Sequence, residues 1–256
     1  MRRLSTHIVL FLFVCNLLSL NTQSQPINTP PGAAPKDSLP ADPAYALALR
    51  QYHDYLKPEP NLYRGGQYAG YHFSLESGHP YFGEEKMRKG TISYNGILYK
   101  DILLVHDLVQ DIVIINDPTN IYMISLIPWQ VDRFTIEDHL FIRLSDSLNP
   151  SAPRNGFYEQ LYKGHILLLK KERKKIEDDV SSPEKGLQHY ISSTTSYYLK
   201  KGDTYYSIGN KRSLIHALGD RSGQIRKFIR KNGLSLRKDK DNTLQKVVAW
   251  YDGNNH

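Results

Sequence analysis

The stretch that decides the fold is TISYNGILY, residues 91–99. β-branched and aromatic residues flank Asn95-Gly96, the dipeptide that best tolerates the positive φ angles of a two-residue type I′ turn. The pattern predicts a β-hairpin with strands 91–94 and 97–99. Because the turn fixes which residues oppose each other, the register of this hairpin is set locally.

Further short apolar segments follow this hairpin, each bounded by Asp, Asn, Pro or Gly. Strands recurring every 8 to 12 residues with tight turns favour an antiparallel meander, which we expect to form a curved sheet or partial barrel. The predicted strands are 102–106, 112–116, 121–127, 133–136, 140–144, 157–162 and 165–170. The polar, charged segment 170–183 predicts a loop or linker.

The last part of the chain changes from strand to helix. Residues 196–200 and 204–208 form a predicted hairpin around Gly202-Asp203. Helical spacing then follows in 225–229 and 244–251, while Gly219 and Gly233 stand where helix C-termini favour a left-handed residue. The fold class predicted is α+β, an antiparallel β meander with a small C-terminal helical cap. We divide it into a β body, 44–180, and a β-hairpin plus basic helical cap, 181–256.

The N-terminal residues predict export. Arg2 and Arg3 precede an apolar run over 8–20, and Thr22 and Ser24 provide the small residues of a cleavage site after position 24. The run is too short to span a bilayer. Residues 1–24 therefore predict a cleaved signal peptide, residues 25–43 a Pro-rich disordered lead, and residues 44–56 a short amphipathic helix.

The single cysteine, Cys15, lies within the apolar run, so the mature chain would contain no thiol. The absence of a thiol excludes disulfides, thiolate metal sites and a cysteine nucleophile from the mature chain. We expect no metal and no cofactor.

Charge is distributed unevenly along the chain. Residues 25–162 carry 11 Lys/Arg against 16 Asp/Glu, a net charge of −5, whereas residues 197–256 carry 13 against 5, a net charge of +8. In an exported protein such a basic end is more typical of contact with an anionic envelope surface or an acidic protein than with nucleic acid.

Catalytic chemistry has only weak support. His72 and His79 lack the spacing of a zinc motif, and no Gly-x-Ser-x-Gly sequence occurs. His106 and Asp107 are adjacent on a predicted strand, so their side chains should point to opposite faces. Asp111 and Asp117 are expected at strand ends and turns. A hydrolase would require His72, Glu76, His79 and His106 to converge in one open cleft.

Two sets of residues are candidates for ligand binding. Tyr71, His72 and His79 belong to a glycine-rich, aromatic stretch that could line a groove or simply pack against the sheet. The second set lies opposite the apolar face of 225–229. These side chains could bind an anionic surface, or they could simply be the solvated face of a helix that packs on the core. The members of this set are Arg226, Lys227, Arg230 and Lys231.

The mature chain resembles a group of uncharacterised exported proteins of Bacteroidota. The resemblance rests on Gly90–Gly96 with Tyr99 and Asp107, on Gly156–Glu159 with Leu161–Gly164, and on Asn210–Leu214. It implies export to the periplasm or outer envelope and transfers no catalytic or ligand residue. We therefore expect an exported, envelope-associated binding or assembly module, with a hydrolase of a cell-envelope polymer as the alternative. The ligand and the oligomeric state stay open.

Overall fold

The computed structural model describes residues 61–145, 148–180, 184, 186–219 and 221–254. All of them belong to one structural unit, residues 53–256. The predicted signal peptide, the Pro-rich lead and the helix at 44–56 lie outside the described residues.

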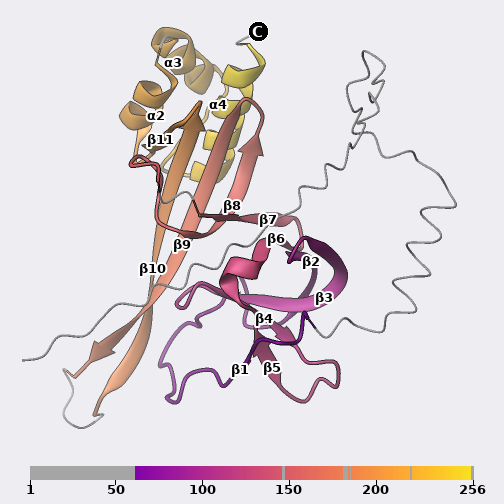
Figure 1. Cartoon of the computed structure of the whole chain (residues 1–256). Helices are drawn as coiled ribbons and strands as arrows, with labels where there is room; N and C mark the ends of the chain where they lie inside the picture. Colours follow the sequence, from indigo (N-terminus) through magenta and orange to yellow (C-terminus); the bar gives the residue numbers. More distant parts are fainter. Residues whose placement is uncertain (1–60, 146–147, 181–183, 185, 220, 255–256) are drawn as a thin grey trace, which may run out of the picture. The chain divides into compact units, whose positions relative to one another are not determined.

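Among the described residues, one open antiparallel sheet of eleven strands dominates the fold (Figure 1). Its order is β1-β5-β4-β3-β2-β6-β7-β8-β9-β10-β11, so most neighbours in space are also neighbours in sequence. The α+β class, the meander and the helical cap are thus confirmed, with the sheet curved but not closed. The strands are β1 (Gly66–Tyr68), β2 (Arg88–Tyr94), β3 (Ile97–Asp107), β4 (Ile112–Asn116), β5 (Met123–Ser125), β6 (Val131–Ile136), β7 (His139–Leu144), β8 (Gly156–Lys163), β9 (Ile166–Asp179), β10 (Gln188–Lys201) and β11 (Thr204–Ser207).

The hairpin predicted from TISYNGILY is present between β2 and β3. Tyr94 pairs with Ile97, and the two turn residues have positive φ, 51° at Asn95 and 77° at Gly96. Positive φ at both central residues is the mark of a type I′ turn. Local turn chemistry therefore sets the register from Ile92 to Tyr99, and the pairing of β2 with β3 shifts only beyond it, between Gly90 and Ile92.

The segment 170–183 is not the loop that its polarity predicts, because β9 continues through it to Asp179. All 14 residues of β9 pair with β10. This two-stranded ribbon satisfies its backbone hydrogen bonds while many of its charged side chains stay in solvent, so no apolar pattern marks it. Strand β5 is also shorter than predicted, because the Asp117 carboxylate accepts hydrogen bonds from the backbone N–H groups of Ile121 and Tyr122.

Three helices and a short 3-10 helix, η1 (Pro128–Gln130), complete the described unit: α2 (Lys211–Leu218), α3 (Ser222–Lys231) and α4 (Lys240–Gly253). Gly219 caps α2 with a φ of 77°, and Gly233, just after α3, has a φ of 61°. Both predicted helix ends are confirmed. No described helix is long and apolar enough to cross a membrane.

Two main apolar clusters stabilise the fold. The first fills the curve of β2, β3, β4, β6, β7 and the start of β8, around Phe134, Phe141 and Phe157. The second lies between the helices and strands β8 to β11, with Leu168, Leu199 and Tyr251 fully buried. The helices thus gather at one end of β8, β9 and β10 (Figure 1). The described helices leave the rest of the β9–β10 ribbon uncovered.

Candidate functional site: a basic pocket on the β9–β10 ribbon

The candidate site lies on one face of the β9–β10 ribbon. Lys171 pairs with Ser196 and Arg173 pairs with Thr194. Paired residues on neighbouring antiparallel strands point to the same face, and so do residues two apart on one strand. The register therefore places a row of basic side chains beside a row of hydroxyl-bearing ones. The two rows are Lys171, Arg173 and Lys175 from β9, and Thr194, Ser196 and Tyr198 from β10.

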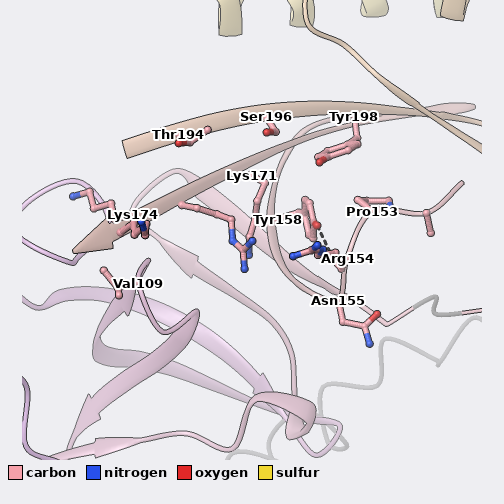
Figure 2. A pocket seen from close by; sticks show the side chains of 13 residues that line it. Val109, Pro153, Arg154, Asn155, Tyr158, Lys171, Lys174, Thr194, Ser196 and Tyr198 are labelled. Carbon is pink, nitrogen blue, oxygen red and sulfur yellow. Dashed lines mark hydrogen bonds between the residues drawn. The ribbon is translucent and has the colours of Figure 1, made fainter. Parts of the chain in front are cut away.

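Other parts of the chain close this face into a pocket of about 660 Å³. The remaining wall comes from the segment Ala152–Asn155, from Tyr158 on β8 and from Val109 in the β3–β4 turn. Figure 2 shows Thr194, Ser196 and Tyr198 in a row along β10, with the Tyr158 hydroxyl donating a hydrogen bond to the Arg154 carbonyl at 2.6 Å. The volume lies within the range of small-molecule binding pockets.

A buried ion pair supports the pocket. Lys171 is only 6% exposed, and its ammonium donates to Asp111 Oδ2 at 2.5 Å and to the Phe157 carbonyl at 2.7 Å. Burial lowers the pKa of Lys171, and the Asp111 charge opposes that shift. Burial would raise the pKa of Asp111, but His106 and Lys171 together lower it to about 2. Asp111 is thus ionised at neutral pH, and its negative charge favours the ammonium form of Lys171.

The Asp111 carboxylate is placed by a strained turn. Asp111 has a φ of 58°, and the turn before it is held by Asp107, whose carboxylate accepts from the N–H groups of Val109 and Gln110. Position 156 must be glycine, because its φ is 144° and a side chain there would clash with Asp111. Left-handed non-glycine residues of this kind occur often at functional sites.

His106 holds the second oxygen of Asp111. Its Nε2 lies 3.0 Å from Asp111 Oδ1, and since an ionised carboxylate only accepts hydrogen bonds, Nε2 carries the proton. Nδ1 is buried without a partner among the described residues. The ring packs edge-on against Phe134, Phe141 and Phe157. His106 is thus a positioning residue inside the core, inaccessible to a ligand.

Two arginines leave the pocket with positive charge that no described carboxylate neutralises. Arg154 and Arg173 are exposed, and neither forms an ion pair within the described part of the chain. The charge of Arg173 contributes to the lowered pKa of Lys171, and both arginine charges act on Tyr158. The two guanidinium charges thus lie near one tyrosine beside the Lys171–Asp111 pair, and a bound anion would relieve the repulsion between Arg173 and Lys171.

The other two lysines of the lining have partners. Lys174 donates to the carbonyls of His79 and Tyr81, and Lys175 pairs with Glu177 in solvent. An exposed pair of this kind is weak and leaves Lys175 able to exchange its partner. Among the described residues, none of those that line the pocket is acidic.

The predicted residues Tyr71, His72 and His79 are not part of this pocket. The Tyr71 hydroxyl donates to Asp107 at 2.8 Å, as does that of Tyr68. His79 Nδ1 accepts from the Tyr81 N–H, and burial lowers its pKa. His72 is exposed. The Tyr71 hydroxyl thus joins its loop to β3, and His79 is bonded within the loop. Ligand binding by Tyr71, His72 and His79 stays a prediction.

The residues required for the hydrolase do not form an open cleft. His106 is 1% exposed, whereas His72 and Glu76 are exposed to solvent. Among the residues that the structure describes, no three His, Cys, Asp or Glu side chains are grouped to hold a metal ion. His106 and Asp111 do meet, through the turn that separates them.

The four predicted basic residues of the cap are all exposed on α3: Arg226, Lys227, Arg230 and Lys231. None of the four forms an ion pair with a described acidic residue. The charge of this helix is therefore not neutralised by docking to the described part of the acidic β body.

Sequence reasoning misses the pocket because the polarity of residues 170–183 predicts a linker. The available signal is the alternation of Lys171, Arg173 and Lys175, which share a strand face only if the segment is extended. The intervening Glu172 and Lys174 conceal this alternation. Comparison of the chain with family models, with curated proteins and with solved structures finds no match.

Proposed function

We propose that the protein is an exported binding module of the periplasm or outer envelope, and that its basic pocket holds an acidic glycan segment. The observation that carries the proposal is the gathering of Arg154, Arg173 and Lys171 around Tyr158, with two guanidinium groups lacking a carboxylate partner in the described chain. Arginine binds planar oxyanions through paired N–H groups.

The hydroxyl groups of the pocket support a glycan over a simple inorganic anion. Thr194, Ser196 and Tyr198 lie along one side, and each hydroxyl can both donate to and accept from a sugar hydroxyl. Export and envelope association rest on the sequence of residues 1–24, and the resemblance to exported proteins of Bacteroidota supports them.

One local arrangement of residues bears on the alternative function, a hydrolase. Ser196 stands directly opposite Lys171 in the β-sheet register, and a serine beside a lysine can act as a nucleophile and base. Here the lysine ammonium is held by a carboxylate and a carbonyl. Both contacts use the Lys171 Nζ as a donor and direct it towards Asp111 and Phe157, so the geometry favours binding over a serine–lysine nucleophile pair.

The proposal is tested by fluorescence anisotropy with labelled tetragalacturonate and with its methyl-esterified, uncharged form. We expect the parent to bind only the charged form, and Arg154→Ala/Arg173→Ala to lose at least about tenfold in affinity. Arg133→Ala, at an exposed arginine on β6, is the matched control and should bind normally. Equal affinity for both forms of the probe, or unchanged binding by the double variant, contradicts the proposal.

A further inference from the structure

A second basic surface lies on helices α2 and α3, apart from the pocket lining. It comprises Lys211 and Arg212 on α2 and Arg226, Lys227, Arg230 and Lys231 on α3, and all six side chains are exposed. We call it the basic cap face.

The fold itself turns these cations outward. On α3, Ile225 and Ile229 are buried in the apolar cluster beneath the helices. Residues four apart share a helix stripe, so Arg226 lies beside Arg230 and Lys227 beside Lys231, away from the buried isoleucines. Helix α2 buries Leu214, Ala217 and Leu218 in the same cluster. Burying both apolar faces therefore fixes the direction of the cations.

The two helices meet at a hollow within the basic cap face. Lys211, Arg212 and Ile215 of α2 and Arg226 of α3 line a space of about 320 Å³. Three cations around one small hollow form a setting in which a phosphate group can contact several of them at once.

The acidic residues of the described cap helices do not neutralise this face. Asp239 caps α4 by accepting from the Asn242 N–H. Asp241 accepts from Lys170 and from Tyr197. Asp252 accepts from Tyr162 and from the His165 N–H. These carboxylates thus cap α4 or tie it to the sheet.

The chemistry of the face selects the kind of partner. Specific protein interfaces usually contain aromatic or aliphatic anchors and are poor in lysine. The large apolar side chains that are exposed in the described structure all lie before residue 188, outside the cap helices. A described surface of lysine and arginine without a large exposed apolar side chain fits a layer of negative charge, as an anionic bilayer presents.

We propose that the basic cap face binds the phosphate headgroups of an anionic membrane surface, with the α2–α3 hollow holding one headgroup. The contact keeps the module at the membrane while the pocket on the ribbon takes its own ligand. Each lysine or arginine near such a surface contributes about fivefold to the affinity, so four of them contribute at least about a hundredfold.

The test is cosedimentation of the mature chain with vesicles of phosphatidylcholine alone and with about 30 mol% phosphatidylglycerol. We expect binding only to the anionic vesicles, at least about a hundredfold loss for Arg226→Glu/Lys227→Glu/Arg230→Glu/Lys231→Glu, and a melting temperature close to the parent value. Two double variants with the same change in net charge separate the effect of where the cations lie from the effect of the total charge on vesicle binding. Arg226→Glu/Lys227→Glu should weaken binding, and Lys100→Glu/Arg133→Glu, both on exposed strand positions, should weaken it far less.

Several outcomes overturn the inference. Equal binding to both vesicle types, or equal loss in the two double variants, excludes a headgroup site on the cap. Binding to polyglutamate without binding to anionic vesicles indicates an acidic protein partner instead. A clearly lower melting temperature in the quadruple variant indicates that the charges are structural. Failure of the pocket proposal is distinguishable, because Arg154→Ala/Arg173→Ala should still sediment with anionic vesicles.

Discussion

The ammonium of Lys171 lies 2.5 Å from Asp111 Oδ2, joining strand β9 to the β3–β4 turn across 60 positions of sequence. This pair stands at the base of the basic pocket and holds the turn that carries Val109 into the pocket wall. Because both groups are largely buried, the pair is costly to break on one side.

Removing both members of the pair should therefore destabilise the protein by less than the sum of the two single removals. We expect Asp111→Asn to cost about 3 kcal/mol of unfolding free energy, since it leaves a buried ammonium without its counter-ion. Asp111→Leu/Lys171→Met should cost clearly less than the sum of Asp111→Leu and Lys171→Met. Urea unfolding of these variants and the parent measures the coupling. Additive losses would show that the two groups contribute independently.

Acid should remove the stabilisation that Asp111 provides. Its pKa in the folded protein is about 2, against an ordinary value of 3.8. Between these values the unfolded chain binds more protons, so the free energy of unfolding falls as the pH falls. The contribution amounts to about 2 kcal/mol, is fully present above about pH 5 and is lost as the pH falls through about 2.

The measurement is the difference in urea unfolding free energy between the parent and Asp111→Asn over about pH 6 to 2. Other carboxylates titrate in both proteins and cancel in the difference. A difference that stays constant over this range would contradict the assignment of Asp111 as an ionised partner of Lys171.

The type I′ turn at Asn95-Gly96 should resist substitution by a β-branched residue. Gly96 has a φ of 77° with no atom within 4 Å of an added Cβ, so the cost of Gly96→Val comes from the backbone alone, about 1 to 2 kcal/mol. Thermal unfolding compares it with Gly223→Ala, at a helical glycine with equally open surroundings. A melting temperature for Gly96→Val close to that of the parent would contradict the turn's role.

Export should remove residues 1–24. We expect N-terminal sequencing of protein recovered from a native-like host to begin at Gln25, because Thr22 and Ser24 supply the small residues before the cleavage site. A recovered form that starts at Met1, or one that carries lipid on Cys15, would disprove cleavage at this position.

Much of the fold can be predicted because its signals act between neighbours in sequence. Asn95-Gly96 specifies its hairpin through the φ angles of two residues, and Gly219 and Gly233 mark helix ends in the same way. The ribbon escapes prediction where those signals disappear. Between Lys171 and Asp179 the strand is defined by hydrogen bonds to β10, and its side chains need no apolar period.

The sequence alone predicts the β meander, the helical cap and the exposed cations of α3. The cations are predictable because burial of Ile225 and Ile229 turns Arg226 and Arg230 outward. Tertiary structure is needed to show that Tyr71 bonds to Asp107, and that Lys171, Arg173 and Arg154 share a pocket. The physical reason is distance along the chain. Pairing of β9 with β10 and capture of Lys171 by Asp111 join residues whose partners no local pattern identifies.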